Sequence, residues 1–386
     1  MEIQRVKDLQ ILNQKIKDSP VVAILGPRQC GKTTLAHQFA SQHPNDKIHF
    51  FDLENPRDLN KLENPMLTLE RLTGFVIMDE IQRKPELFPV LRVLADSQHF
   101  TKYLILGSAS RHLVSQGSES LAGRISFMEL GGFSLELLGS DKWEQLWTRG
   151  GFPRFFLARD DKVSFELRQD FISTFLERDI PALGIQIPPQ TLRRFWMMLA
   201  HYHGQIFNAS EIGQSLGVAD TTIRRYLDIL SNTFMIRQLQ PWLPNVKKRL
   251  VKRPKIYFRD SGLFHALLSI ENLNDLSNHP KLGASWEGFA IEQIVSFLRL
   301  REEEVFFWAL HTGAELDLLF FKNGKPFGIE IKYSDTPKVT QSMKSAIEDL
   351  TLEHLWVVYP GKDAYPLEEK ISSVSIHHLA AITSIL

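Results

Sequence analysis

The sequence predicts an α/β protein of several domains, and its first third has the pattern of a parallel sheet. Apolar runs of strand length alternate with stretches that suit helices, as expected when helical crossovers join parallel strands. One run leads into a glycine-bounded loop and then a helix, and another ends in two adjacent acidic residues. The predicted strands are 21–25, 48–53, 74–78 and 103–106. Ligands of such sheets bind at the carboxyl ends of the strands, so a site is expected there.

The loop after the first predicted strand reads GPRQCGKT and fits the pattern G-x-x-x-x-G-K-[ST]. Backbone N–H groups in this context converge at a helix N-terminus, whose dipole favours negative charge. Lys32 is expected to reach the β- and γ-phosphates of ATP, and the Thr33 hydroxyl is expected to hold Mg²⁺. The predicted nucleotide-binding residues are Gly26, Pro27, Arg28, Gln29, Cys30, Gly31, Lys32, Thr33 and Thr34.

Residues 74–78 are apolar and lead directly into Asp79 and Glu80. At the end of a buried strand this acidic pair is expected to serve hydrolysis. Asp79 holds Mg²⁺, directly or through water, and Glu80 polarises the attacking water. The alternative interpretation is a solvated strand end.

The next strand, 103–106, ends in Gly107-Ser108-Ala109-Ser110. We predict that Ser108 senses the γ-phosphate and positions water, with Ser110 as the second choice. The alternative is a serine that caps a helix or stabilises a turn.

The segments GPRQCGKTT, FVIMDEIQ, LILGSAS and LAGRISFMEL together resemble the AAA+ ATPases, specifically the bacterial and archaeal family with a companion DUF4143 region. The resemblance implies an ATPase core at 1–132 and a helical lid at 133–190. It also implies an arginine, from a neighbouring subunit or from the lid, that completes the site. Arg124 is the first candidate and Arg154 the second, although either is equally well explained as a structural ion-pair residue.

Residues 191–268 contain two helical stretches joined by a tight turn, followed by a strand and a basic segment. This order predicts a winged helix-turn-helix that binds double-stranded DNA through phosphate contacts. The alternative is a protein–protein module, because winged helices serve both purposes. The residues expected to face DNA are Thr221, Thr222, Arg224 and Arg225 on the second helix, and Lys247, Lys248, Arg249, Lys252, Arg253 and Lys255 on the wing. Arg259 and Asp260 are expected to form a local ion pair, and residues 269–283 read as a linker.

The last segment, 284–386, contains Glu287 on a predicted helix and Asp317 on a predicted strand. The return strand of the hairpin places Glu330 and Lys332 on one face, close to Asp317. Converging carboxylates suit Mg²⁺, and a lysine beside them suits activation of water. We predict Asp317 and Glu330 as metal ligands, and all four residues as catalytic.

This arrangement resembles the PD-(D/E)XK restriction-endonuclease-like fold, although Leu316 stands where that motif has proline. The resemblance implies a nuclease-like domain, and many members of the fold only bind. Two hypotheses follow. One is an ATP-driven enzyme acting on nucleic acid, and the other is a regulatory ATPase switch whose C-terminal domain only docks a partner protein or DNA.

Lysine plus arginine and aspartate plus glutamate balance at 45 each, so any basic surface must be local. A single cysteine fits a reducing compartment, and neither a secretory signal nor a membrane span is expected. The sequence therefore predicts a soluble cytoplasmic protein. The AAA+ resemblance adds a homo-oligomer as an option.

Overall fold

A computed structural model describes residues 3–97, 101–108, 119–243 and 251–386, which fall into two compact units. The N-terminal unit is Met1–Gly132 with Asn232–Phe234, and the C-terminal unit is Phe133–Ser231 with Met235–Leu386. The division after residue 132 lies where the sequence predicts the end of the ATPase core.

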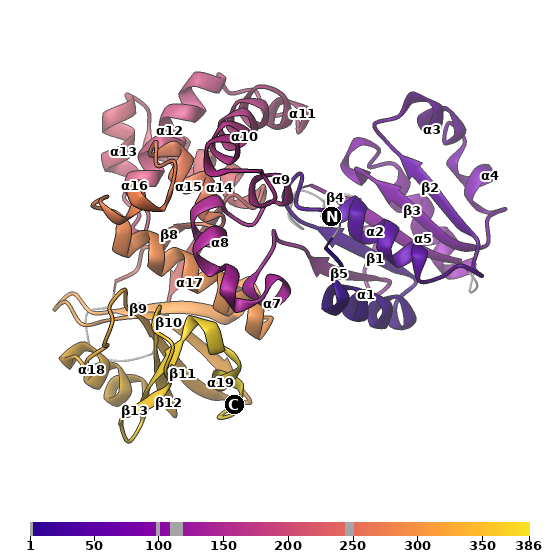
Figure 1. Ribbon diagram of the computed structural model, residues 1–386. Helices are drawn as coiled ribbons and strands as arrows, with labels where there is room; N and C mark the ends of the chain where they lie inside the picture. The colour runs from indigo at the N-terminus through magenta and orange to yellow at the C-terminus, as the bar shows by residue number, and fades with distance from the viewer. Residues whose placement is uncertain (1–2, 98–100, 109–118, 244–250) are drawn as a thin grey trace. The chain divides into compact units, whose positions relative to one another are not determined.

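The N-terminal unit is built on a five-stranded parallel sheet in the order β2-β3-β4-β1-β5 (Figure 1). Its strands are β1 (Val21–Leu25), β2 (Ile48–Asp52), β3 (Gly74–Asp79), β4 (Thr101–Gly107) and β5 (Ile125–Glu129). β1 therefore lies between β4 and β5, and β4 separates it from β3. Residues that follow β1, β3 and β4 consequently meet at one edge of the sheet.

Helices cover the sheet because its inner strand β1 has buried apolar side chains on both faces of the sheet. α1 (Val6–Asp18) and α2 (Lys32–Ser41) share a core with one face of β1, β3 and β4. α5 (Leu87–Ser97) also packs against β4, and the short α3 (Pro56–Lys61) and α4 (Pro65–Leu69) follow β2. In α1, Leu9, Leu12 and Ile16 are buried at helical spacing, which explains why this segment docks on the sheet.

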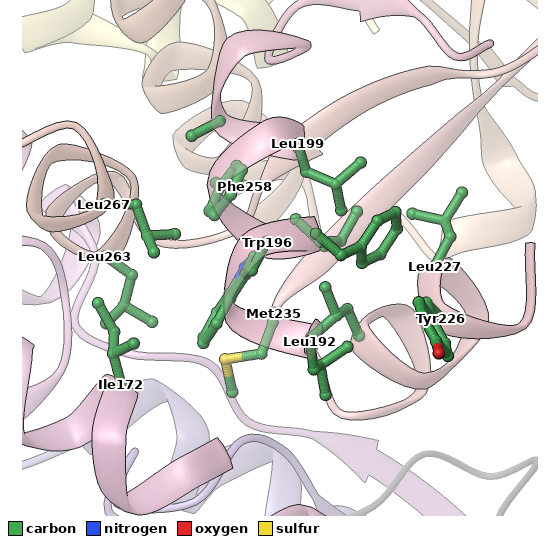
Figure 2. Close-up of a cluster of buried hydrophobic side chains, with 14 of the residues drawn as sticks. Ile172, Leu192, Trp196, Leu199, Tyr226, Leu227, Met235, Phe258, Leu263 and Leu267 are labelled. Atoms are coloured by element: carbon green, nitrogen blue, oxygen red, sulfur yellow. The ribbon is translucent and has the colours of Figure 1, made fainter. Parts of the chain in front are cut away.

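The first part of the C-terminal unit is helical, and its helices share one core. The elements are α7 (Leu135–Leu138), α8 (Trp143–Arg149), α9 (Pro153–Phe156), α10 (Asp161–Thr174), a π-helical turn (Phe175–Asp179), α11 (Ile180–Ala182), α12 (Pro189–His201), α13 (Ala209–Leu216), α14 (Asp220–Asn232) and α15 (Ser261–Leu267). Figure 2 shows Trp196 of α12 within this core, where its ring stacks on Phe258 with 6.3 Å between centroids. Ile172 of α10 and Leu227 of α14 belong to the same core. The predicted division at residue 190 therefore crosses a continuous core.

The predicted linker at 269–283 is not an extended connection. It contains α16 (Leu273–Ser277), capped by Asn272, and α17 (Leu282–Leu298) begins within it. The expected ion pair between Arg259 and Asp260 is wrong as well. The Asp260 carboxylate accepts hydrogen bonds from the N–H groups of Leu263 (2.8 Å) and Gly151 (2.7 Å), so it caps α15. Arg259 instead forms an ion pair with Glu292 at 3.7 Å.

A nine-stranded sheet runs through the rest of the unit in the order β13-β14-β12-β11-β10-β9-β7-β8-β6 (Figure 1). Its strands are β6 (Gln205–Ile206), β7 (Ile236–Pro241), β8 (Lys255–Phe258), β9 (Val305–Ala309), β10 (Glu315–Lys322), β11 (Lys325–Ile331), β12 (His354–Tyr359), β13 (Tyr365–Glu368) and β14 (Ile371–Ser375). β7 pairs in parallel with β9, so the strands beside the helix-turn-helix continue into the C-terminal sheet. α17 and α18 (Gln341–Leu350) pack against that sheet, and α19 (Ala380–Thr383) follows it.

In the described parts of the chain, no helix combines the length and the apolar character needed to cross a lipid bilayer.

Candidate functional site: two acidic centres

The loop between β1 and α2 has the backbone that the motif requires. Gly31 has φ 102°, in the left-handed region that glycine adopts without steric cost. A Cβ on Gly26 would lie 2.0 Å from the carbonyl oxygen of Leu130, so only glycine fits there. The loop also contacts the preceding helix region, because the Arg5 guanidinium donates to the carbonyl oxygen of Cys30 at 2.8 Å.

Lys32 is buried and bends back over the loop. Its Nζ donates to the carbonyl oxygens of Gly26 (3.0 Å) and Pro27 (2.9 Å), and it stands 4% exposed. These acceptors are neutral, so the charge of the ammonium group remains available for a phosphate. The cysteine of the loop, Cys30, is buried with its Sγ 3.3 Å from the carbonyl oxygen of Leu130, as expected of a packing thiol.

Thr33 and Asp79 meet although 46 positions separate them. The Thr33 hydroxyl donates to Oδ2 of Asp79 at 2.6 Å, which joins the start of α2 to the end of β3. Asp79 Oδ1 accepts from the N–H of Glu80 at 2.9 Å, and burial raises the pKa of the Asp79 carboxyl. A threonine hydroxyl beside a half-buried carboxylate is a donor set of hard oxygen atoms, which suits Mg²⁺.

Glu80 has φ 57°, a left-handed conformation that is uncommon for residues other than glycine. Its Oε2 accepts from the Ser108 hydroxyl at 3.1 Å and from the side-chain amide of Gln82. Gln82 Nε2 also donates to Ser108 Oγ at 2.9 Å. Glu80, Gln82 and Ser108 therefore form one network at the carboxyl ends of β3 and β4. The second choice, Ser110, lies outside the described residues.

Sequence reasoning missed Gln82, and although it named Arg28 for the loop, it missed Arg83 and the partner that both arginines share. Arg28 and Arg83 both donate to Oε1 of Glu54, at 2.9 and 2.8 Å. The two arginines lower the pKa of Glu54 against the opposing effect of burial. The signal was present in the sequence, because Gln82 and Arg83 follow the acidic pair after one residue, Ile81. A glutamine and an arginine after an acidic strand end are too common to be selected without the fold.

The predicted arginine candidates lie elsewhere. Arg124 precedes β5, and its carbonyl oxygen accepts from the N–H of Val21 at the amino end of β1, whereas the loop follows the carboxyl end of β1. The Arg124 guanidinium forms a bidentate pair with Asp96, at 2.5 and 3.0 Å. Arg124 thus stands at the opposite edge of the sheet from the loop of its own chain. Arg154 is exposed on α9 of the C-terminal unit.

The second acidic centre lies on β10 and β11, where the fold brings the predicted residues together. Asp317 Oδ2 accepts from the N–H of Ile331 at 2.8 Å, and the Lys332 ammonium is 2.6 Å from Glu330 Oε1. The other oxygen of Glu330, Oε2, is buried without a hydrogen-bond partner in the described part of the chain. Burial raises the pKa of Asp317 far above its usual range and also raises that of Glu330.

The fourth predicted residue, Glu287 on α17, is held by two groups that the sequence did not suggest for this centre. Oε1 of Glu287 accepts from the Tyr257 hydroxyl and lies 3.4 Å from the Lys255 ammonium. Lys255 also donates to Glu315 and lies 3.9 Å from Oδ1 of Asp317. Lys255 is therefore not a DNA-facing residue of the wing: it is buried among carboxylates, because the strand β8 that carries it lies inside the sheet.

Two acidic side chains, Asp317 and Glu330, remain for a metal ion in this centre. Across the described residues, no group of three or more His, Cys, Asp or Glu side chains is arranged to hold a metal ion. Burying a charged oxygen without a hydrogen-bond donor or a cation beside it costs free energy. Glu330 Oε2, which has no partner among the described residues, is therefore a position where a cation would stabilise the centre. Mg²⁺ commonly takes only one or two protein carboxylates and completes its shell with water and phosphate. The residues present fit such an ion.

The residues predicted to contact DNA are partly exposed. Thr221, Arg224 and Arg225 of α14 are exposed, as are Lys252 and Arg253 before β8, while Thr222 is half-buried. Arg224 lies 3.8 Å from Asp220 on the same helix. The predicted wing residues Lys247, Lys248 and Arg249 lie outside the described residues.

Three family descriptions match consecutive parts of the chain. An AAA domain (AAA_14) matches residues 18–138, and two domains of unknown function, DUF8612 and DUF4143, match residues 140–274 and 282–379. The boundary between the first two lies close to the division between the two structural units.

Relatives match along all or most of the chain. The uncharacterized protein Rv2008c of Mycobacterium tuberculosis is 46% identical over 386 residues, which cover 100% of this chain and 86% of that protein. The uncharacterized protein MJ1544 of Methanocaldococcus jannaschii is 24% identical and matches 92% of this chain and 83% of its own length. Among solved structures, the Walker-type ATPase Paby2304 of Pyrococcus abyssi superposes with a TM-score of 0.50 at 13% identity, over 69% of this chain and 96% of that one.

The parallel sheet, the phosphate-binding loop joined to Asp79 and the matches along the whole chain agree. The chain belongs to the family of AAA-type P-loop ATPases with a DUF4143 C-terminal domain, which includes Rv2008c.

Proposed function

We propose that this protein hydrolyses ATP with Mg²⁺ and that hydrolysis controls its action on nucleic acid. The observation that carries the first part is the 2.6 Å hydrogen bond between Thr33 and Asp79, which assembles the loop and the acidic strand end into one site. Lys32 leaves two neutral carbonyl oxygens to bind the phosphates. Bound Mg²⁺ supplies positive charge to the phosphates as the γ-phosphoryl group is transferred.

Glu80 orients the attacking water in this proposal, and Ser108 and Gln82 hold its carboxylate. A rigidly held carboxylate loses less orientation entropy when water binds, so both neighbours serve the reaction through Glu80. The location of Arg124 at the far edge of the sheet supports a role towards a neighbouring chain of a homo-oligomer rather than towards its own site.

The proposed nucleic-acid surface is the winged helix formed by α13, α14 and the strands β6, β7 and β8. Exposed cations on α14 and before β8 support it, since phosphate contacts by lysine and arginine supply sequence-independent affinity. The exposed cations named for this surface are Arg224, Arg225, Lys252 and Arg253. We expect the protein to act in the cytoplasm, where ATP and nucleic acid are available.

A salt titration of duplex DNA binding tests that surface. Each phosphate contact that is lost should lower the slope of log K against log salt by about 1. The variant Lys252→Ala/Arg253→Ala should therefore have a slope lower by about 2, while Lys344→Ala on α18 should keep the wild-type slope. An unchanged slope in the double variant would remove these residues from the DNA interface.

The C-terminal centre has a second candidate function, Mg²⁺-dependent cleavage of a phosphodiester. The specific observation in its favour is the buried Glu330 Oε2, which has no partner in the described chain and lies with Asp317 and Lys332 in one centre. Asp317 and Glu330 would hold the ion, which lowers the pKa of a bound water. Lys332 would orient that water. In the competing hypothesis this centre only binds a partner protein or DNA.

One paired assay separates these functions. ATP hydrolysis and cleavage of several DNA and RNA substrates are measured with Mg²⁺ and with Mn²⁺, with and without duplex DNA. Lys32→Ala should abolish ATP hydrolysis, and Asp317→Ala should abolish cleavage while ATP hydrolysis persists. Cleavage that persists in Asp317→Ala assigns the activity to a contaminant, and no cleavage by the wild type on any substrate favours the binding function.

A further inference from the structure

The side chain of Lys255 ends in the C-terminal acidic centre, although its strand belongs to the proposed winged helix. It is 3% exposed, and its ammonium group has three acidic neighbours: Glu287, Glu315 and Asp317. An ammonium group buried to this extent is stable only when such neighbours compensate the lost hydration. The ammonium group of Lys255 therefore belongs to the acidic centre.

Once all its carboxyl groups are ionised, as metal binding requires, the centre carries more negative than positive charge. Four carboxylates, those of Glu287, Glu315, Asp317 and Glu330, face two ammonium groups, those of Lys255 and Lys332. Two negative charges remain, which is the charge that one divalent ion neutralises. Glu330 Oε2 is buried and has no hydrogen-bond partner among the described residues, so the missing positive charge is expected on the Glu330 side of the centre and not on the Lys255 side.

Lys255 stands where a second ion would need to be. In two-metal sites the ions lie about 3.5–4 Å apart and share a carboxylate. Asp317 has one oxygen towards Ile331 and the other, Oδ1, 3.9 Å from the Lys255 ammonium. An ion that used Asp317 Oδ1 together with Glu287 would meet Lys255, and Glu287 is also bound by Tyr257.

We propose that Lys255 is a built-in second cation: its ammonium group takes the place of a second divalent ion, so the centre binds one metal ion and not two. The proposal deepens the cleavage function and rests on it for the ion at Asp317 and Glu330. It also links the proposed winged helix to the centre, because β8 carries the ammonium group into it.

The test counts Mn²⁺ ions bound to the full chain without nucleotide. All proteins carry Asp79→Asn, so that the ATP site does not add an ion, and free Mn²⁺ is measured by electron paramagnetic resonance. Lys255→Met should bind one more ion per chain than the parent. The matched control Lys344→Met, an exposed lysine of the same unit, should bind as many ions as the parent. Equal numbers in Lys255→Met and the parent overturn the proposal.

Asp317→Asn in the parent distinguishes the two claims. Loss of an ion in this variant supports the metal site of the proposed function, and an unchanged count overturns that site whatever Lys255→Met does. If circular dichroism shows that Lys255→Met does not fold, the parent at saturating Mn²⁺ decides. One ion that depends on Asp317 supports the role of Lys255, two such ions overturn it, and none removes the metal site on which it rests.

Discussion

The two acidic centres of this protein treat their lysines in opposite ways. In the ATP site, Lys32 rests on two backbone carbonyl oxygens, and no carboxylate neutralises it in the contacts described here. In the C-terminal centre, Lys332 is paired with Glu330 and Lys255 lies among three carboxylates. The ammonium group of the first site is therefore available to bind a phosphate. In the second site, carboxylates of the same chain neutralise most of the positive charge. Similar residue types thus yield a ligand-ready site in one unit and a partly neutralised site in the other.

The largest expected effect tests whether catalysis belongs to the first centre. Glu80→Gln keeps the size of the side chain but removes the negative charge that orients water. ATP hydrolysis should fall about 100-fold or more, the usual contribution of a general base, while ATP affinity stays the same. Phosphate release and nucleotide binding are measured together, with the exposed Glu86→Gln as control. A wild-type rate in Glu80→Gln would end the assignment of Glu80.

Acid should remove the stability that the neutral ring of His265 contributes to the C-terminal unit. This buried histidine lies 3.0 Å from the Thr148 carbonyl oxygen and 2.7 Å from Ser285 Oγ, and burial lowers its pKa to about 3. The folded state holds the neutral ring and the unfolded state binds a proton below about pH 6.5, so stability falls as pH decreases through this range. At pH 5 the loss is about 2 kcal/mol.

The measurement is denaturant unfolding at pH 7 and pH 5, followed by tryptophan fluorescence. All seven tryptophans lie in the C-terminal unit, so this signal reports that unit alone. Relative to wild type, His265→Gln should lose about 2 kcal/mol less stability between pH 7 and pH 5, whereas the exposed His201→Gln should behave as wild type. Equal acid sensitivity in wild type and His265→Gln would contradict the role of this histidine.

A smaller effect is expected where Tyr257 binds Glu287. Tyr257→Phe leaves the half-buried carboxylate of Glu287 with one donor fewer, and a hydrogen bond to a charged group contributes about 2 kcal/mol. The tryptophan-detected stability of the C-terminal unit should fall by about this amount, with ATP affinity unchanged. Tyr333→Phe, at an exposed position, is the control. No loss in Tyr257→Phe would mean that Lys255 alone neutralises Glu287.

The smallest effect sharpens the description of the ATP site. Ser108→Ala removes one of the two hydrogen bonds to Glu80, and the loss of about 1.4 kcal/mol corresponds to a tenfold lower hydrolysis rate. Gln82→Ala should have a similar effect. The double variant should deviate from the product of the single effects, because both residues hold the same oxygen and contact each other. Independent effects would contradict a shared network.

Local patterns predict much of the N-terminal unit. A glycine that must fit beside Leu130, an apolar strand and an acidic strand end all leave signatures within a few residues. Weaker sequence signatures belong to three features whose partners lie far away along the chain. These are the strand β5, the residue Gln82 and the pair of arginines on Glu54. The linker failed as a prediction because a polar, turn-rich composition also suits the short capped helix α16.

The sequence by itself determined the phosphate-binding loop, the pairing of Thr33 with Asp79 in one site, and the candidates Asp317, Glu330 and Lys332. These depend on residue types and on strand periodicity, which short stretches of chain encode. Only the tertiary structure decided that helices on both sides of residue 190 share one core. It also decided that the side chain of Lys255 lies in an acidic centre and not on the surface of the predicted basic wing. The pairing of β7 with β9 makes β8 part of the long sheet, which buries the ammonium group of Lys255. A buried ammonium group is stable only beside carboxylates, and in this fold those carboxylates come from other elements of the sheet and from α17.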